Sequence, residues 1–302
     1  MSIRRHMPLA ALLAAGVLMF AATANAQLTL VEPGFLGTTL SNDLAKQIEV
    51  GVGPDTCLYY GSNEGLRQRC APSDASTICD ESLTFPSGIA FSTGGSFGSA
   101  MYVADFGIGD IHRATGCGAT TPFATIATPG AIAFPPSGSA YGDYLYACKA
   151  YDGPIYRVSS TGEVTSWLDF PTVYLRFGPG GDWGTGLYAT DQTTPGHGAI
   201  VKISSAGDVT PLVDNFLIPE GFDWGFDGDL FATDQSRGQI LRVKPDGAAT
   251  LFATLPGAAD VAYRPGEQAL YAVSTQGGLY RITPASTPTK ATSWGQVKGL
   301  YR

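Results

Sequence analysis

Short apolar segments recur along this chain in a fixed order and at a nearly fixed spacing. One segment with alternating large apolar and small residues occurs six times, at intervals of about 40 to 46 residues, over 56–62, 100–105, 143–148, 186–191, 229–234 and 269–274. An apolar run precedes each of these segments, and a glycine-containing turn and two further short segments follow it. Alternation with a period of two, bounded by turn residues, is typical of β-strands. Each unit is therefore predicted to contain four short strands.

A four-stranded sheet of this kind cannot bury both of its faces alone, whereas a ring of such sheets can. The repeat therefore predicts an all-β fold, a six-bladed β-propeller of four-stranded antiparallel blades. A β-sandwich would not explain a period that carries the same strand order each time. The predicted blades are 44–84, 85–126, 127–170, 171–216, 217–255 and 256–296.

How the ring closes is left open by the sequence. Residues 27–43 precede the first predicted blade and are expected to add an outer strand. Residues 297–302 resemble the start of another inner strand. A seven-bladed ring built from both ends of the chain is therefore the alternative to six blades.

The first 26 residues have a different pattern from the repeats. Arg4 and Arg5 precede an apolar stretch over 8–22, and Ala24-Asn25-Ala26 has the small-residue pattern of a cleavage site. These features predict a secretory signal peptide over 1–26. The apolar stretch is shorter than the roughly 20 residues of a membrane anchor. We expect a single propeller domain over 27–302, secreted or periplasmic, with no membrane span after removal of the signal peptide.

Composition excludes several functional classes. The 302 residues include 39 Gly and 20 Pro, which favours many turns, and only 15% of them are charged. The formal net charge of −8 argues against a nucleic-acid partner, which would need a basic surface. Phosphate-cradling and dinucleotide motifs are absent from the sequence, so no organic cofactor is expected. We expect a monomer whose partner is a small molecule in the central channel.

Five cysteines, Cys57, Cys70, Cys79, Cys117 and Cys148, follow the predicted signal peptide. Disulfides are the usual state of cysteines in an oxidising compartment. Three of the five lie between Cys57 and Cys79, which predicts at least one disulfide there. Because five is an odd number, one thiol is left outside the intramolecular pairs.

The repeated motifs resemble a known group of propellers. The Y-[VA]-[AT]-D end of the second segment, the [IL]-x-[RK]-[VI] third segment and the P-x-G start of the first are similar to the NHL-repeat and SMP-30/gluconolactonase-like group. The resemblance covers nearly all of 27–302. It implies a six-bladed propeller, and it leaves the activity open, because the group includes lactonases, lyases and binding proteins.

Carboxylates at the ends of the second segments are the first candidate site. Asp105, Asp191 and Asp234 occupy this place in three blades, and Cys148, Ser62 and Ser274 are assigned to it in the others. Asp191 and Asp234, with Glu220, are the predicted ligands of a divalent metal, with Ca²⁺ the favoured ion because it prefers oxygen ligands. The alternative is structural: each Asp accepts hydrogen bonds from the backbone N–H groups of the following turn.

The starts of the first segments vary between blades, and a position that varies is a better candidate for function. Glu220 differs most from the residues at the same position in the other blades. The resemblance implies a metal held by an acid or amide directly before Gly, and Glu220-Gly221 matches that pattern. The other blades have Ser87, Pro129, Val173 and Ala259 there, which are poor ligands or none.

We predict a polar cluster around Glu220, in which Glu220 and Asp260 are catalytic. Tyr174 and Arg176 are the predicted substrate-binding residues. An ion pair between Arg176 and Asp223 on neighbouring first strands is the structural alternative for the arginine.

His197 is the third predicted catalytic residue. It lies in the longest loop between second and third segments, and histidine is the usual proton carrier near neutral pH. His112 occupies a third-segment position and is expected to pack between blades. With so few histidines, the His dyad and three-His zinc sites known in similar propellers are excluded.

Two functions follow from these features. The first is an exported metal-dependent hydrolase or lyase acting on a small ester, lactone or sugar-derived substrate in the central channel. The alternative is a non-catalytic propeller that binds a ligand or protein partner through its loop face. Carboxylates that converge on one point would favour the enzyme, and carboxylates bonded to their local backbone would favour the binding protein.

Overall fold

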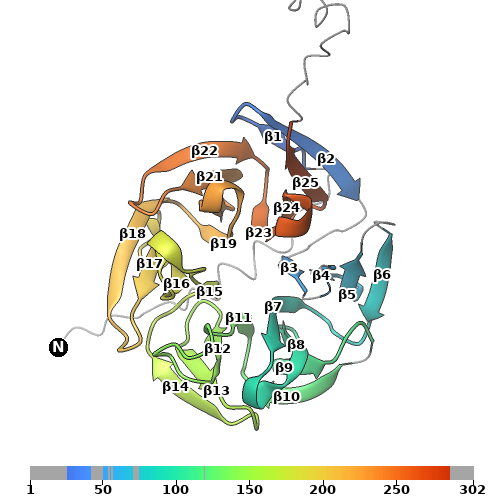
Figure 1. The fold of residues 1–302 in the computed structure, drawn as a ribbon, viewed down its shortest axis with the longest axis vertical. Coiled ribbons are helices and arrows are strands. Elements are labelled where there is room, and N and C mark those ends of the chain that lie inside the picture. Colours follow the sequence, from blue (N-terminus) through green and yellow to red (C-terminus); the bar gives the residue numbers. More distant parts are fainter. Residues whose placement is uncertain are drawn as a thin grey trace, which may run out of the picture.

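The structure is a computed structural model, and it describes residues 26–41, 50–53, 55, 57–70, 75–118 and 120–285. Six antiparallel sheets surround a central axis (Figure 1). The predicted six-bladed β-propeller of four-stranded blades is confirmed. Residues 1–25 of the signal peptide predicted over 1–26, and the segment 297–302, lie outside the described residues.

Each of the first four blades is a meander of consecutive strands. Blade 1 contains β3 (Val50–Val52), β4 (Leu58–Ser62), β5 (Gly65–Arg69) and β6 (Ser76–Asp80). Blade 2 contains β7 (Pro86–Thr93), β8 (Ser99–Asp105), β9 (Asp110–Ala114) and β10 (Thr121–Thr125). Blade 3 contains β11 (Pro129–Ala133), β12 (Leu145–Lys149), β13 (Ile155–Val158) and β14 (Val164–Leu168). Blade 4 contains β15 (Leu175–Phe177), β16 (Leu187–Asp191), β17 (Gly198–Ile203) and β18 (Val209–Phe216).

The last two blades use the N-terminal segment as well. Blade 5 contains β19 (Pro219–Trp224), β20 (Leu230–Asp234), β21 (Gln239–Val243) and β22 (Ala249–Thr254), and the short β1 (Thr29–Leu30) pairs with β22. Blade 6 contains β23 (Ala258–Arg264), β24 (Ala269–Ser274) and β25 (Leu279–Pro284), and β2 (Phe35–Ser41) is its outermost strand. Figure 1 shows β1 and β2 beside β22 and β25. The outer strand expected from residues 27–43 is therefore present, and it completes the sixth blade.

A repeated pair of side chains explains the recurring sequence motif. The large aromatic residue of each second strand lies directly across from the basic residue of the third strand, as in Tyr146 and Arg157. Arg157 Nε donates a 2.8 Å hydrogen bond to the Tyr146 hydroxyl, which in turn donates to the Tyr141 carbonyl at 2.8 Å. The same cross-strand pair recurs in the five other blades as Tyr60–Arg67, Tyr102–Arg113, Tyr188–Lys202, Phe231–Arg242 and Tyr271–Arg281.

In four blades the turn between the first and second strands contains a short 3₁₀ helix. These turns lie at the end of the blades opposite to the end where the first strands begin. These segments are η1 (Gly95–Phe97), η2 (Gly181–Trp183), η3 (Phe226–Gly228) and η4 (Pro265–Glu267). In η1 and η2 the second-strand tyrosine reaches the backbone of this turn: the Tyr102 hydroxyl donates to the Phe97 carbonyl at 3.3 Å, and the Tyr188 hydroxyl donates to the Trp183 carbonyl at 2.6 Å. The repeat is thus a structural device, because in the five blades where the second-strand aromatic is a tyrosine, its buried hydroxyl is hydrogen bonded.

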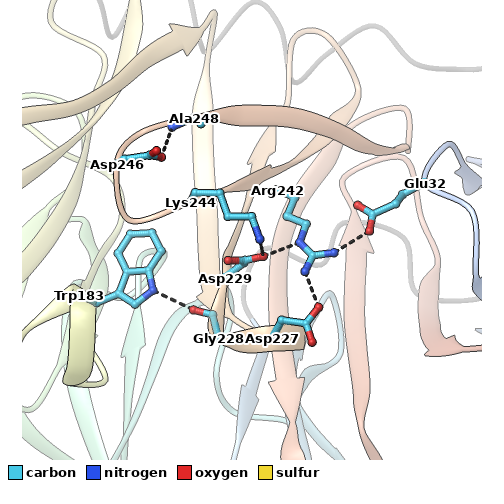
Figure 2. A network of polar contacts seen from close by, with 9 residues as sticks. All are labelled: Glu32, Trp183, Asp227, Gly228, Asp229, Arg242, Lys244, Asp246 and Ala248. Atoms are coloured by element: carbon cyan, nitrogen blue, oxygen red, sulfur yellow. Dashed lines mark hydrogen bonds and ion pairs between the residues drawn. The ribbon is translucent and has the colours of Figure 1, made fainter.

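A polar network attaches the N-terminal segment to blade 5 (Figure 2). The Arg242 guanidinium pairs with Glu32 at 2.5 Å, and with Asp227 and Asp229 at 2.6 Å each. Lys244 contacts the same Asp229 carboxylate at 2.5 Å. Glu32 lies between β1 and β2, so one arginine links the closing strands to the blade beneath them.

Two disulfides involve blade 1. Cys57 bonds to Cys70 within the blade, which confirms the prediction of at least one disulfide among the three cysteines of residues 57–79. Cys79 bonds to Cys117 of blade 2. Cys148 is a buried thiol outside both pairs, and its sulfur lies 3.4 Å from the Val173 carbonyl oxygen. Two disulfides are compatible with an extracellular or periplasmic protein. Within the part of the chain that is described, no helix has the length and apolarity to cross a membrane.

Replacing Arg242 tests the contribution of this network to stability. Arg242→Met keeps an aliphatic side chain but leaves the nearly buried Asp229 with Lys244 alone. We expect a loss of roughly 2–3 kcal/mol in the free energy of unfolding, below the value for a fully buried pair because Asp227 is exposed. Guanidinium denaturation measures it. Lys149→Met is the control, since its ion pair with Asp152 is exposed and should contribute less than about 1 kcal/mol; equal losses would show that the network does not secure closure.

Candidate functional site at the mouth of the central channel

The innermost strands begin with an irregularity at the same place in four blades. The pairing of first and second strands shifts between Pro86 and Gly88, between Pro129 and Ile132, between Pro219 and Phe222, and between Ala258 and Asp260. A β-bulge bends a strand and turns one side chain in a new direction, and bulges are common next to active sites. The strand-one starts, where the sequence varies, are therefore the positions at which the fold presents side chains at the mouth.

Neighbouring first strands approach one another closely at these bulges. A Cβ atom added at Gly221 would lie 1.9 Å from Asp260 Oδ1 and 2.7 Å from Asp260 Cα. One added at Gly88 would lie 2.6 Å from the Gly130 carbonyl oxygen. The glycine after Glu220 is needed because the blade 6 strand occupies the space of its side chain. This contact places the blade 5 and blade 6 carboxylates, Glu220 and Asp260, side by side.

The environment of Glu220 favours its protonated form. Burial is the main cause and the neighbouring Asp260 charge adds to it, and together they raise the pKa of the Glu220 carboxyl from 4.5 to about 8, although a hydrogen bond from Gln192 lowers it. Asp260 is fully buried, and its Oδ1 accepts a 2.8 Å hydrogen bond from the Val261 N–H. A carboxyl group with this pKa holds a proton at neutral pH and can donate it.

Gln192 and Tyr151 complete the surroundings of Glu220. Gln192 follows β16, and its Nε2 donates to the Pro219 carbonyl at 2.5 Å, so that its amide is fixed against the blade 5 strand start. Tyr151 follows β12 in blade 3, and the Glu220 charge is the main cause, ahead of burial and Cys148, that raises the pKa of its phenol above the usual range. Residues from four consecutive blades, 3 to 6, therefore meet around one carboxyl group.

A pocket of about 240 Å³ lies beside this group. It is lined by Tyr151, Pro171, Thr172, Val173, Gln192 and Thr193, from the loop after β12, the segment before β15 and the loop after β16. Gln192 belongs both to the pocket wall and to the hydrogen bond with Glu220. A small ligand in the pocket would therefore lie next to an acid that can donate a proton.

The predicted aspartates at the second-strand ends bond to nearby backbone. The buried Asp105 carboxylate accepts hydrogen bonds from the N–H groups of Thr84, Phe85, Gly107 and Ile108. Asp234, also fully buried, accepts hydrogen bonds from the N–H groups of Leu217, Ile218 and Arg237. Asp191 accepts from the N–H and the hydroxyl of Thr193 at 2.8 and 2.6 Å. These contacts are those of the structural alternative, in which each Asp fixes the turn around it.

The sequence alignment of this position needs one correction. Pro129 of blade 3 lies across from Lys149, just as Pro86 lies across from Asp105 and Pro219 from Asp234. The equivalent residue in blade 3 is therefore Lys149 and not Cys148. Apolar character alone places Cys148 at the end of the second strand, one residue before the true equivalent. The register of the strands instead follows the aromatic residue, Tyr146.

The two predicted substrate-binding residues lie deeper along the first strands. Arg176 forms a 2.7 Å ion pair with Asp223, and Asp223 also accepts a 2.8 Å hydrogen bond from the Tyr263 N–H. The ion pair between Arg176 and Asp223 is therefore the structural alternative that the sequence left open for Arg176. The hydrogen bond from Tyr263 extends these contacts from blade 4 to blade 6. Tyr174 is buried, and its ring lies 5.8 Å from the Arg176 guanidinium.

The histidines differ in exposure. His197 is exposed in the loop between β16 and β17, at the same face as Gln192. His112 is buried, as expected from its third-strand position, and its Nδ1 lies 3.0 Å from the Thr120 hydroxyl. Of the three predicted catalytic residues, the contacts described here bring Glu220 and Asp260 together and do not join His197 to them.

The described ranges contain no cluster of metal-binding side chains. No three His, Cys, Asp or Glu side chains come together there in a way that could hold a metal ion. Of the predicted ligands, Asp234 is enclosed by backbone donors, and Asp191 bonds to Thr193. Neither fits a shared site with Glu220 in this arrangement.

Sequence reasoning missed Gln192 and Tyr151. Gln192 directly follows the Asp191 motif, at a place where the other blades have Phe106, Ala150, Gln235, Thr275 and Asn63. Gln235 of blade 5 shares the residue type, which hides the difference at the level of sequence. Tyr151 lies in a loop with no counterpart of the same length, so the repeat offers no comparison for it.

Comparison with known proteins supports the fold. No family model and no curated protein matches the chain. Among solved structures, a gluconolactonase from Xanthomonas campestris shares 13% identity over 86% of this chain and 94% of its own, with a TM-score of 0.64. Virginiamycin B lyase from Staphylococcus aureus shares 15% identity over 88% and 97%, with a TM-score of 0.56. A chain of a nidogen–laminin complex shares 15% over 76% and 99%, with a TM-score of 0.57.

These similarities define a class of architecture. The expected resemblance to gluconolactonase-like propellers is confirmed in the fold, and it extends to lyase propellers. At these identities the likeness carries no activity over to this chain, since propellers of one architecture perform unrelated functions.

Gly221→Ala tests the close approach that places Glu220 beside Asp260. The added methyl group would overlap Asp260, so the blade 5 and blade 6 strands must separate. We expect a loss of about 1–3 kcal/mol in the free energy of unfolding, or more, as for an overpacked core. Gly266→Ala is the matched control, because no heavy atom lies within 4 Å of the added Cβ, and it should change stability by less than about 0.5 kcal/mol. Two variants of equal stability would contradict the described contact.

Proposed function

We propose that this protein is a hydrolase or lyase that acts on a small ester, lactone or sugar-derived substrate at the channel mouth. The observation that carries the proposal is a carboxyl group, Glu220, that is protonated at neutral pH and lies beside a small pocket. Perturbed acids in clefts are concentrated at catalytic sites. The likeness in fold to gluconolactonase and lyase propellers supports the same class of reaction.

In this mechanism Glu220 is the general acid and then the general base. During ester or lactone hydrolysis, a water oxygen adds to the carbonyl carbon, and the bond from that carbon to the leaving oxygen breaks. Glu220 donates its proton to the leaving oxygen, and the resulting carboxylate takes a proton from the attacking water. The side chain ends in the state in which it began, and no further reactant is needed.

The neighbouring residues prepare Glu220 for this role. Asp260 is buried and accepts a hydrogen bond from the Val261 N–H, and its electrostatic effect on Glu220 makes loss of the Glu220 proton less favourable. Gln192 holds the carboxyl group through a hydrogen bond and is itself fixed by the Pro219 carbonyl. His197, exposed in the adjoining loop, remains a predicted proton carrier between the mouth and solvent.

Metal dependence and export are two further parts of this proposal, and the reaction described for Glu220 does not depend on either. The predicted Ca²⁺ ligands Asp191 and Asp234 do not fit a shared site with Glu220, so no step above uses a metal. Dependence on a metal therefore stays a prediction to be tested separately. Export follows from the predicted signal peptide, and the two disulfides are compatible with it.

One observation favours the alternative of a non-catalytic binding propeller. The rim aspartates bond to local backbone rather than converging, which is the arrangement expected of a scaffold. In that case the pocket beside Glu220 would bind a ligand that leaves unchanged. Binding without turnover, in an assay in which a known lactonase is active, would select this alternative.

Turnover by Glu220→Gln tests the proposal. Glutamine has nearly the same shape and cannot donate a carboxyl proton, so we expect kcat to fall by about 10²–10⁴ on whichever lactone or ester the wild-type chain hydrolyses. Because the protonated form of Glu220 acts as the acid, wild-type activity should decline as the pH rises through about 8. Initial rates between pH 6 and 10 on a panel of uncharged lactones and esters measure both effects.

Two controls accompany that assay. Glu163→Gln changes an exposed glutamate in a hairpin of blade 3 and should keep wild-type turnover. Repeating the assay and thermal melting in EDTA and in added Ca²⁺ tests the metal, since saturation at 100 times the dissociation constant would add about 2.7 kcal/mol. Full activity of Glu220→Gln would overturn the proposal, and a Ca²⁺-raised midpoint lost in Glu220→Gln would restore a metal-dependent mechanism.

A further inference from the structure

The N-terminal segment shows how an extended chain binds to the outer edge of a blade. On blade 5, β1 pairs with the outer strand β22, and the N–H groups of Val31 and Glu32 donate to the Phe252 carbonyl at 2.9 and 3.1 Å. The Glu32 carboxylate pairs with Arg242 on the next strand inward (Figure 2). Two features therefore hold this segment: a backbone carbonyl on the outer strand and the terminal nitrogens of an arginine.

Phe252 lies at a bulge that recurs in the outer strands. The register between the third and fourth strands shifts there, and one residue of the fourth strand is left out of the pairing. That residue is Phe252 in blade 5 and Trp167 in blade 3. It is Phe123 in blade 2 and Leu212 in blade 4. Blade 3 thus has, in Trp167, the counterpart of the residue whose carbonyl binds the N-terminal segment.

In blades 2 and 4 the hairpin of the next blade covers this carbonyl. A Cβ atom added at Gly162 would lie 2.3 Å from the Phe123 carbonyl oxygen. One added at Gly247 would lie 2.4 Å from the Leu212 carbonyl oxygen. The equivalent glycine beside blade 3 is Gly207, where an added Cβ atom would meet one side-chain carbon at 3.4 Å and no backbone oxygen within 4 Å. No strand lies outside β14 among the described residues (Figure 1). The bulge of blade 3 is therefore not covered as its counterparts are.

Arg157 of blade 3 is the counterpart of Arg242. Its Nε donates to the Tyr146 hydroxyl, and its terminal nitrogens form neither an ion pair nor a hydrogen bond within the part of the chain that is described. In the five other blades the terminal nitrogens of this basic residue contact a carboxylate or a backbone carbonyl, as they do in Arg67, Arg113, Lys202, Arg242 and Arg281. Blade 3 therefore lacks the partner that every other blade provides.

Tyr144 takes the place of an acid in this blade. It lies two residues before the second-strand aromatic, where blade 5 has Asp229, and Asp229 pairs with Arg242. The Arg157 guanidinium lies 5.5 Å from the centre of the Tyr144 ring and 4.9 Å from that of the Trp167 ring. Aromatic faces, which attract a cation, hold the guanidinium at a surface where Tyr144 is 36% exposed. A carboxylate from another chain can pair with its terminal nitrogens.

The two acids nearest in sequence affect which anion fits. Asp143 accepts a 2.6 Å hydrogen bond from the Ser96 hydroxyl of blade 2, and Glu163 is exposed in the hairpin between β13 and β14. Neither forms an ion pair with Arg157 in this arrangement. Their negative charges oppose a multiply charged anion such as phosphate more strongly than they oppose one carboxylate. A single carboxylate is therefore the ligand that suits this arginine.

We propose that the outer edge of blade 3, formed by β14, Arg157, Tyr144 and Trp167, binds an extended acidic segment of a partner protein. A carboxylate of that segment pairs with the terminal nitrogens of Arg157, and its backbone N–H groups donate to the Trp167 carbonyl, as those around Glu32 do on blade 5. Addition of an extended segment to the edge of a sheet is a known mode of peptide recognition. This proposal does not depend on Glu220 or on the channel mouth.

A peptide copied from the N-terminal segment is the probe. It has the sequence of residues 27–34 with blocked ends, and a second peptide carries Gln in place of Glu32. Both are titrated onto the folded chain, in which the chain's own segment already occupies the edge of blade 5. Nitrogen-15 NMR of the Arg157 side chain reports binding. We expect the Glu peptide to bind at least about tenfold more tightly than the Gln peptide, and high salt to weaken it.

Two variants separate the binding site from the fold. Arg157→Met removes the charge and should abolish the preference for the Glu peptide. Tyr144→Asp places a carboxylate where blade 5 has Asp229, so it should pair with Arg157 from within the chain, lose peptide binding and keep the cooperative melting of the wild type. Lys202→Met is the control, because this residue occupies the same place in blade 4 and contacts the Trp183 carbonyl. It should bind both peptides as the wild type does.

Three results would overturn the inference: equal binding of the two peptides, no binding of either, or wild-type binding by Tyr144→Asp. Sedimentation of the chain alone checks the occupant. Self-association that is lost in Arg157→Met would assign the edge to a second copy of this chain and contradict a separate partner. None of these measurements uses turnover, so failure of the reaction proposed for Glu220 would leave them unchanged.

Discussion

The close approach of the first strands at the channel mouth is the constraint on which the site depends. Six innermost strands must converge around one axis, and each leaves little room beside its neighbour. Gly221 and Gly88 show the limit, since a Cβ atom at either position would overlap the adjacent strand. The residue directly before such a glycine is then held at a fixed place on the rim. In blade 2 this residue is Ser87, whose hydroxyl donates to the Pro129 carbonyl at 2.7 Å and serves the scaffold.

In blade 5 the same place holds Glu220, and its setting changes the chemistry. Its neighbour in blade 6 is a second acid, Asp260. The two strands can come this close because Gly221 has no side chain. The fold thus brings two carboxyl groups together and partly removes them from water, and this combination keeps one of them protonated. The same arrangement of strands that stabilises the ring therefore creates an acid suited to proton transfer at neutral pH.

Residues that repeat between blades and residues that do not repeat have different roles. The second-strand aromatics and third-strand basic residues, such as Tyr146 and Arg157, recur because they face each other in the same cross-strand pair of every blade. The rim aspartates recur for the same reason, as the backbone contacts of Asp105 and Asp234 show. The candidate site depends instead on Glu220 and Tyr151, which have no counterpart in the other blades, and on Gln192, which shares its residue type only with Gln235 of blade 5.

This difference explains how much could be predicted from the sequence. The periodic pattern was sufficient for the fold, because it reflects a local rule that each blade obeys. It favoured six blades over seven, and the choice became certain only because β2 completes the sixth blade. Glu220 could be found as an exception to the repeat, and the Arg176–Asp223 pair could be anticipated from neighbouring strands. The contributions of Tyr151 and Gln192 could not, because they depend on how loops of different blades meet across the mouth. The Cys148 position was misaligned because one residue of register cannot be fixed by apolar character alone.

A direct titration of Glu220 is the measurement closest to the central claim. Carbon-13 NMR of a chain labelled in glutamate side chains, with Glu220→Gln to assign the signal, would follow this carboxyl group through neutral pH. The account predicts a midpoint near 8, shifted down in Asp260→Asn because the neighbouring charge is removed. A midpoint near 4.5 in the wild-type chain would show that Glu220 is an ordinary ionised carboxylate, and the acid proposed for the channel mouth would not exist.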